Sequence, residues 1–134
     1  LREIDSSVEL VAVHDAARPL IDTATIEAVV QAARRTGAAI PATAISSTIK
    51  RVDAAMRVTE TVPRAQLWAA QTPQIARRDW LVDAFAKRAK SQPTDEAQLL
   101  EQAGYPVEVV SGLASNFKIT TQDDLELAKA WLGA

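Results

Sequence analysis

Short strand-like runs and helical periods follow one another along the first forty residues. Leu10–Val13 is a short apolar run rich in β-branched residues, which is typical of a strand buried on both faces in the middle of a parallel sheet. Between residues 23 and 37 apolar positions recur at helical spacing, with the pair Asp22-Thr23 as the candidate N-cap. Residues 38–42 predict a second strand. Strand, helix and strand form a βαβ unit, for which we expect a right-handed crossover.

A different pattern follows, in which β-forming residues are mostly polar. Residues 47–52 and 57–62 are two such segments, and residues 53–56 join them over the length of a hairpin loop. Neither segment has a wide apolar face, and an isolated hairpin is only marginally stable in water. The pattern therefore predicts an arm that either lies over the sheet of its own chain or reaches a partner chain.

The second half of the chain returns to helical periods and short strands. Residues 63–74 hold two prolines and no clear period, which indicates an ordered loop. Two helices are expected over residues 77–90 and, with Thr94 as the N-cap, from 94 to about 103. A last helix is expected after a capping box of Thr121 and Asp124. Strands are expected at 106–110 and 116–120. The sequence therefore predicts one α/β domain with a polar arm inserted.

Composition removes several classes of function. The 134 residues are enough for one domain, and 48% hydrophobic with 24% charged residues is ordinary for a globular protein. A formal net charge of -2 argues against a non-specific nucleic-acid binder. Without cysteine, disulfides and thiolate metal sites are excluded. The sequence has no apolar run as long as a membrane span, and its N-terminus lacks the order of a signal peptide.

Several familiar catalytic patterns are also missing from the sequence. The four glycines are too far apart for either common phosphate-cradling loop. A single histidine without cysteine makes a dedicated transition-metal cage unfavourable. No serine lies in a G-x-S-x-G elbow, so His14 has no nucleophile to activate. The residues alone favour a structural role for His14.

What remains is a set of cations and hydroxyls suited to phosphate, following the first strand and spread over later loops. Arginine offers a bidentate fork, lysine a compact charge, and threonine a hydroxyl donor. Asp15 is a candidate for holding a metal-bound water or a substrate hydroxyl. Each residue also has a simpler explanation, such as a strand-end ion pair, a helix cap, a turn or a solvated charge. The candidates are Asp15, Arg18, Thr48, Arg64, Thr72, Thr94 and Lys118.

Taken together, these stretches resemble the C-terminal part of the 2-C-methyl-D-erythritol 4-phosphate cytidylyltransferase family. The H-D-A-A-R-P and T-P-Q motifs together are the most specific part of this resemblance. Order and spacing fit across nearly all of the chain. The matching segments are residues 13–19, 48–52, 67–74, 94–97 and 116–120.

The resemblance implies a fold, a reaction and partners. It implies an α/β, Rossmann-like nucleotide-diphospho-sugar transferase sheet, of which residues 1–134 form the C-terminal part of a single domain. It implies a homodimer interlocked through an arm of about residues 45–68. It also implies transfer of CMP from CTP to methylerythritol phosphate with a divalent metal, usually Mg²⁺, in a cytoplasmic or, in plants, plastid enzyme of isoprenoid precursor synthesis. For the arm, the resemblance favours the partner chain.

The resemblance also assigns roles to the candidate residues. Lys118 matches the lysine that positions the attacking phosphate, and Arg64 is the second catalytic assignment. Thr48 and Arg64 match arm residues that reach the phosphate pocket of the neighbouring subunit. The residues that match the substrate pocket of their own chain are Asp15, Arg18, Thr72 and Thr94. No direct metal ligand is assigned in this chain.

The chain departs from the family pattern in one respect. Family members begin with a Gly-rich loop that holds the CTP triphosphate, and this sequence has no such loop. We therefore expect the chain to be a piece of such an enzyme that alone neither binds CTP tightly nor turns over. Two alternatives stay open: a ribitol-5-phosphate cytidylyltransferase, and a non-catalytic dimerisation or phosphosugar-binding module.

Overall fold

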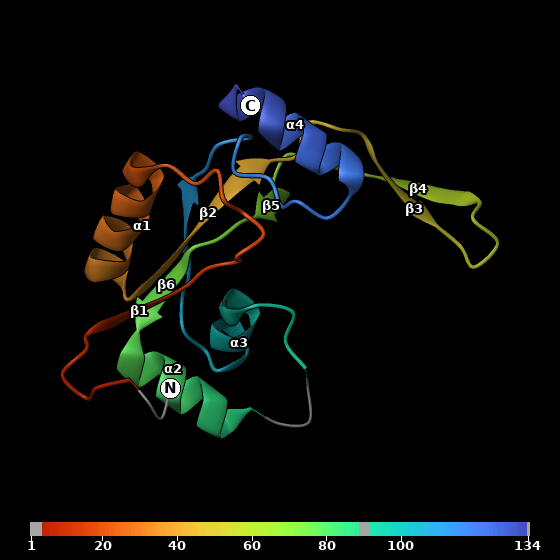
Figure 1. Cartoon of the computed structure of the whole chain (residues 1–134). Helices are drawn as coiled ribbons and strands as arrows, with labels where there is room; N and C mark the ends of the chain where they lie inside the picture. Colours follow the sequence, from red (N-terminus) through yellow and green to blue (C-terminus); the bar gives the residue numbers. More distant parts are fainter. Residues whose placement is uncertain (1–3, 89–91, 134) are drawn as a thin grey trace.

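A mixed sheet organises the computed structural model, which describes residues 4–88 and 92–133 (Figure 1). The main sheet contains five strands of the described residues, and a separate two-stranded sheet forms the arm. The main-sheet strands are β1 (Leu10–Val13), β2 (Ala38–Ala44), β5 (Trp68–Ala70), β6 (Gln74–Arg77) and β7 (Glu108–Ser111). The arm strands are β3 (Ile49–Val52) and β4 (Val58–Val62), and the helices are α1 (Thr23–Thr36), α2 (Arg78–Lys87), α3 (Glu96–Gln102) and α4 (Gln122–Leu132).

The strand β2 lies at the centre of the main sheet. It pairs in parallel with β7 on one side and antiparallel with both β6 and β5 on the other. Outside β6 lies β1, again antiparallel, so β1 and β2 run in the same direction with β6 between them. The α/β fold class is confirmed, but the mainly parallel sheet expected around β1 is wrong for the described residues, because β1 pairs with an antiparallel neighbour and its last two residues are exposed. A four-residue apolar run does not encode which strand lies beside it.

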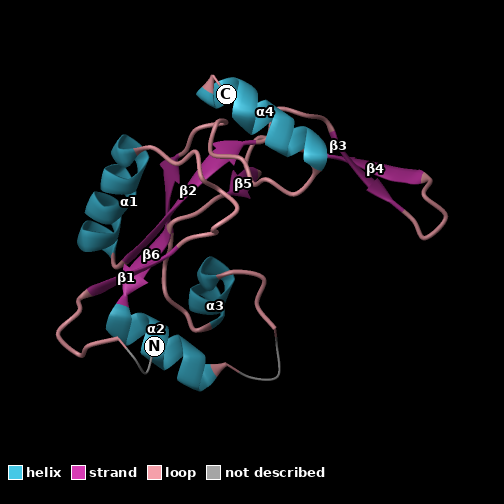
Figure 2. Ribbon diagram, viewed as in Figure 1, coloured by secondary structure: helices cyan, strands magenta, loops and turns pink. Residues whose placement is uncertain are grey.

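Helices cover both faces of this sheet (Figure 2). On one face α1 packs Val29 and Ala33 against Ile75 of β6. On the other face α2 and α3 contribute Leu81 and Leu99 to a second cluster. Adjacent alanines of β2 alternate between the two clusters, as the period of two in a strand requires. Among residues 4–88 and 92–133, no helix is long and apolar enough to cross a membrane.

The helix boundaries follow the predicted caps with one exception. Asp22 accepts a hydrogen bond from the Thr25 amide, and Gly37 ends α1 with φ +97 beside the Trp80 ring, where a Cβ would lie 2.2 Å from the ring. Thr121 and Asp124 form the predicted capping box of α4. The prediction that Thr94 caps α3 is wrong, because the carboxylate of Asp95 accepts the Gln98 amide instead.

Residues 63–77 and 116–120 differ from their predictions. The expected loop over 63–74 contains β5 and the first residue of β6, and the expected helix at 77 begins only at 78. Residues 116–120 form no strand; one backbone bond, from the Ile119 amide to the Ala17 carbonyl, ties this loop to the loop after β1. Both strands that were missed have four residues or fewer and gain their order from pairing with β2.

The arm forms as predicted and projects away from the body in Figure 1 rather than lying over the sheet. Arg51 and Glu60 lie opposite each other in the register and form an ion pair of 2.8 Å. At the tip the Asp53 carboxylate accepts the amides of Ala55 and Arg57, which closes the turn. Trp68 pairs with Ala44 in the main sheet, so the separate two-stranded sheet ends before it.

Candidate functional site

A hollow of about 430 Å³ lies where the end of β1, the junction of β5 and β6, the start of α3 and the loop after β7 meet. Its volume is in the range of small-molecule sites. Five of the seven residues predicted from the sequence line it, although they come from four separate segments of the chain. These are Asp15, Arg18, Thr72, Thr94 and Lys118.

The junction between β5 and β6 forms the base of the hollow. Both strands pair with the same side of β2, but two residues of β2, Ile40 and Pro41, lie opposite four residues of the other strand, 71–74. The Gln71 amide donates to the Pro41 carbonyl at 2.8 Å, which keeps the interrupted ladder attached. Such an irregularity turns side chains out of the regular alternation. Here it brings Gln71 and Thr72 to the hollow.

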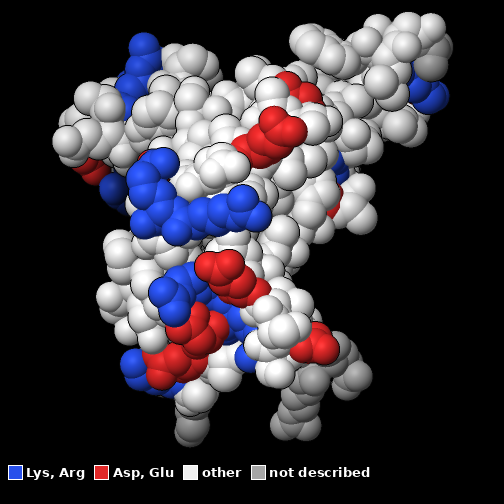
Figure 3. Space-filling view, turned by 90° about the vertical axis from the view of Figure 1, so that its left-hand side faces the viewer, with Lys and Arg blue, Asp and Glu red and all other residues white. Residues whose placement is uncertain are grey.

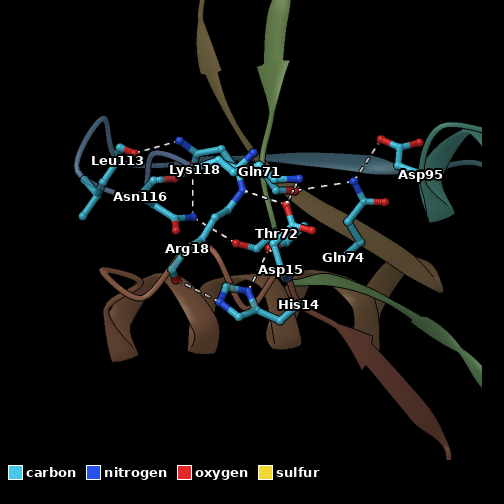
Figure 4. Close-up of polar contacts among 10 residues, drawn as sticks. All are labelled: His14, Asp15, Arg18, Gln71, Thr72, Gln74, Asp95, Leu113, Asn116 and Lys118. Carbon is cyan, nitrogen blue, oxygen red and sulfur yellow. Dashed lines mark hydrogen bonds and ion pairs between the residues drawn. The ribbon is translucent and has the colours of Figure 1, made fainter. Parts of the chain in front are cut away.

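Buried amide side chains hold this junction to the loop that carries Lys118. Asn116 is 1% exposed, and its amide donates to the Gln71 side-chain oxygen at 3.2 Å and to the Thr72 carbonyl at 2.9 Å. Gln71 in turn donates to the Leu113 carbonyl at 2.8 Å (Figure 4). Because buried polar groups are costly unless paired, these bonds fix the two segments in one arrangement.

A second buried amide holds α3 in place. The Gln74 side chain is 4% exposed. It donates to the Asp95 carboxylate at 3.0 Å and accepts the Ala97 amide at 2.8 Å. Thr94 lies at the rim of the hollow, where its hydroxyl and its amide both donate to the Gln98 side chain. The order of this corner therefore depends on Gln74, not on Thr94 as a cap.

Charges of both signs meet inside the hollow. One carboxylate oxygen of Asp15 lies 3.3 Å from the Arg18 Nε and 3.3 Å from the Lys118 Nζ. Arg18 is largely buried, with 13% of its side chain exposed, and also donates to the Asn116 carbonyl at 2.8 Å. Lys118 stays half exposed. Arg88, at the end of α2, adds a third cation to the lining. The carboxylates of Asp15, Asp95 and Glu96 line the same hollow, so cations and carboxylates are equal in number there. The Asp15–Arg18 ion pair is thus a structural contact inside a site of mixed charge.

His14 is tied into the same network. Its Nδ1 lies 2.8 Å from the Thr72 hydroxyl, and its Nε2 lies 3.1 Å from the Arg18 carbonyl. The Thr72 hydroxyl also accepts the Asp15 amide at 3.0 Å. Three residues of the H-D-A-A-R-P motif and the threonine of the T-P-Q motif therefore share one set of bonds.

The structure does not bring Thr48 and Arg64 to this hollow. Thr48 lies directly before β3, and the Arg64 guanidinium donates to the Ser46 carbonyl on the opposite side of the arm's base. Both predicted residues therefore belong to the arm, and neither lines the hollow.

The capping box of α4 follows directly on the loop that carries Lys118. Hydrogen bonds from the Thr120 amide and hydroxyl, with those of Thr121, lower the pKa of Asp124 to about 2. The carboxylate therefore stays ionised near neutral pH and continues to hold the end of this loop.

Charges of both signs also lie together on the outer surface. Figure 3 shows basic and acidic side chains side by side on one face, in agreement with the small net charge. Within residues 4–88 and 92–133 no group of three or more His, Cys, Asp or Glu side chains could hold a metal ion.

Sequence reasoning missed the residues that support the site. Gln71, Gln74 and Asn116 are polar residues inside short motifs, and buried polar residues are unusual unless they are bonded. Gln71 and Gln74 flank the T-P pair, and Asn116 lies two residues before Lys118. Their positions beside candidate residues are the one local signal that could have indicated a supporting role.

Comparison with known proteins adds independent support. The sequence profile of the 2-C-methyl-D-erythritol 4-phosphate cytidylyltransferase family matches residues 1–134. A cytidylyltransferase of that description from Alkaliphilus metalliredigens is 43% identical over 134 residues, which cover 98% of this chain and 56% of the relative. A bifunctional IspD/IspF enzyme from Anaeromyxobacter dehalogenans is 46% identical, covering 93% of this chain and 34% of the relative.

Solved structures agree with these sequence matches. The crystal structure of 2-C-methyl-D-erythritol 4-phosphate cytidylyltransferase from Thermus thermophilus superimposes with a TM-score of 0.87 at 38% identity. The match covers 96% of this chain and 64% of that one. The chain thus spans about half the length of the single-function curated relatives and a third of the bifunctional ones.

Proposed function

This chain belongs to the 2-C-methyl-D-erythritol 4-phosphate cytidylyltransferase family, and we propose on that premise that the complete protein transfers CMP from CTP to methylerythritol phosphate. An oxygen of the acceptor phosphate attacks the α-phosphorus of CTP, the bond to the bridging oxygen of the β-phosphate breaks, and pyrophosphate leaves. The observation that carries the proposal is the convergence of Asp15, Arg18, Thr72, Thr94 and Lys118 on one hollow.

The charges of the hollow suit this reaction. The acceptor phosphate and the nucleotide triphosphate repel each other, so the protein has to hold two anions together and neutralise charge as it develops. Arg18, Lys118 and Arg88 supply three cations to a cavity that three carboxylates also line. A phosphate monoester is already a nucleophile, so the reaction needs no activated serine or cysteine.

We assign a separate role to each cation of the Asp15 cluster. Arg18 is bonded on both sides, to Asp15 and to the Asn116 carbonyl, so it forms a fixed wall of the acceptor site. Lys118 has a single 3.3 Å contact with Asp15 and a half-exposed side chain. It can therefore turn from Asp15 to a bound phosphate, which places it beside the reacting phosphorus.

The divalent metal of the proposal accompanies CTP. When bound, a metal such as Mg²⁺ would neutralise charge on the triphosphate. Among the described residues no group of three or more His, Cys, Asp or Glu side chains could hold it.

The proposal includes a second subunit. Thr48 and Arg64 lie on an arm that projects from the body, away from the hollow of their own chain. We propose that the arms of two chains interlock and that each delivers Thr48 and Arg64 to the phosphate end of the partner's hollow. This arrangement gives a role to both residues that the hollow of their own chain does not use.

The test is turnover of the complete protein with CTP and methylerythritol phosphate, measured as pyrophosphate release. Lys118→Ala is expected to lower kcat by roughly a hundredfold, because it removes charge stabilisation at the reacting phosphorus. Its melting temperature should stay close to that of the wild type, since Lys118 is half exposed. Lys129→Ala, which removes an exposed lysine of α4, is the matched control.

Two outcomes would contradict the proposal. Full turnover by Lys118→Ala would remove the assigned role of the lysine. Faster turnover with ribitol 5-phosphate than with methylerythritol phosphate would favour the ribitol enzyme as the function of the complete protein.

A further inference from the structure

The imidazole of His14 lies between two oxygen atoms that make different demands on it. Its Nε2 faces the Arg18 backbone carbonyl at 3.1 Å, and its Nδ1 faces the Thr72 hydroxyl at 2.8 Å. A carbonyl oxygen only accepts, so Nε2 must carry the hydrogen. A neutral imidazole has one N–H, so its Nδ1 is then an acceptor and receives the hydroxyl proton of Thr72.

The hydrogen-bonding capacity of the Thr72 hydroxyl is thereby nearly used up. A hydroxyl has one donor and two acceptor positions. Its proton goes to His14, and one lone pair accepts the Asp15 amide at 3.0 Å. What remains is a single lone pair on a side chain that lines the hollow.

We propose that His14, in its neutral form, is a positioning residue that makes Thr72 a hydrogen-bond acceptor, so that Thr72 binds a hydroxyl group of the acceptor substrate and not its phosphate. An acceptor cannot bind a phosphate oxygen, which is itself an acceptor, but it can bind an alcohol O–H. In this arrangement the cations Arg18 and Lys118 bind the phosphate, and the polyol end of the substrate lies at Thr72. This inference rests on the proposed function, because it divides a polyol phosphate between two parts of the hollow.

The other neutral tautomer conflicts with the contacts seen. If Nδ1 carried the only hydrogen, Nε2 would present a lone pair to the Arg18 carbonyl, and two acceptors would face each other at 3.1 Å. The ring orientation is supported in the same way, since both nitrogens face oxygen partners as drawn in Figure 4.

The first test reads the tautomer directly. His14 is the single histidine of the 134 residues, and His14→Gln identifies its signals in the complete protein. In a protein labelled with ¹⁵N-histidine at about pH 8, where an ordinary imidazole is neutral, we expect an Nε2–H resonance and an Nδ1 shift typical of an unprotonated nitrogen. The Nδ1–H tautomer as the main form would overturn the proposal.

The second test separates the two ends of the substrate by calorimetry of the complete protein, with methylerythritol phosphate and inorganic phosphate as probes. Thr72→Val removes the hydroxyl with little change of shape, and Thr72→Ser is the matched control that keeps it. We expect Thr72→Val to weaken methylerythritol phosphate roughly fivefold to tenfold and to leave phosphate affinity within about twofold. An equal loss for both probes would overturn the assignment.

A double-mutant cycle shows whether His14 acts through Thr72. His14→Gln can still donate to the Arg18 carbonyl, but it has no ring nitrogen in the Nδ1 position that faces Thr72. We expect His14→Gln to raise KM for methylerythritol phosphate several-fold in the wild-type background and to have little further effect beside Thr72→Val. Fully additive effects would indicate a merely structural histidine and would contradict the proposal.

The outcomes distinguish this inference from the proposed function. A wild-type protein that binds no methylerythritol phosphate would overturn the proposed function, and the imidazole spectrum would still decide the hydrogen-bond polarity. Conversely, normal turnover with an Nδ1–H tautomer would sustain the proposed function and end the inference about His14.

Discussion

The base of the hollow and the arm are stabilised in opposite ways. At the base, nearly buried amide side chains of Gln71, Gln74 and Asn116 bond to backbone and to one another between segments far apart in the sequence. On the arm, contacts join neighbouring strands at the surface, and the ion pair of Arg51 with Glu60 has both side chains about half exposed or more. The bonds at the base therefore contribute substantially to the stability of the folded chain, while the exposed contacts of the arm contribute little.

This difference separates residues that shape a site from residues that are only delivered to one. Asp15 and Arg18 are held in position by bonds within one chain, and Lys118 already reaches Asp15 in the same chain, so the three lie together in this structure. Thr48 and Arg64 have no comparable surroundings. Their proposed role requires a second chain, and changes on the arm should affect the reaction more than they affect folding.

The largest effect on stability is expected at the base. Asn116→Ala removes an amide that is 1% exposed and leaves the Gln71 side-chain oxygen and the Thr72 carbonyl without this donor. We expect a loss of about 2–4 kcal/mol in the free energy of unfolding, measured by urea denaturation.

The control removes an amide of the same kind from the surface. Gln122→Ala deletes a side chain that bonds to Glu126 on its own exposed helix face, and it should change stability by less than about 0.5 kcal/mol. Equal losses of unfolding free energy in Asn116→Ala and Gln122→Ala would mean that the buried amides at the base do not stabilise the chain more than an exposed amide does.

The sequence predicts much of the fold because its signals are local. The cap at Asp22, the glycine that ends α1, the capping box of α4 and the alternation of the arm all depend on residues within a few positions of one another. The antiparallel neighbour of β1 and the strands β5 and β6 depend on pairing with distant segments, which short runs do not encode.

The candidate site divides along the same line. The sequence indicates Asp15, Arg18 and Lys118 as candidate site residues, because the charge of a side chain shows which ligands it can bind. The buried amides Gln71 and Asn116 were missed, because their roles exist only once 71–74 meets 112–118 in space. The roles of the seven candidate residues in binding and catalysis stay predictions.

An effect of intermediate size, on turnover and not on stability, is expected when a residue of the arm is changed. Arg64→Ala should lower turnover roughly tenfold through loss of a charged contact to phosphate, with unchanged thermal stability. Mixing Arg64→Ala with Lys118→Ala subunits sharpens the test. If each arm serves the partner, a mixed dimer has one site with both residues intact, and random pairing should restore about a quarter of wild-type activity.

The alternative arrangement predicts the opposite result of mixing. If Arg64 served the hollow of its own chain, every site in the mixed sample would lack one of the two residues. Activity would then stay at the level of the separate variants. Subunits must be unfolded and refolded together for this comparison, so that exchange is complete before the rate is measured.

The smallest effect is a local loosening of the arm in acid. Hydrogen bonds from the Arg57 amide, then from Ala55 and the Arg57 side chain, hold the pKa of Asp53 below its ordinary value of 3.8. Because the folded-state pKa is lowered, the stabilisation is present above the unfolded value and is lost as pH falls through the lowered one. We expect the amide resonances of Ala55 and Arg57 to shift in this range before those of β2 and β6. Asp53→Asn should abolish the pH dependence, and an unchanged titration in that variant would show that another group controls the turn.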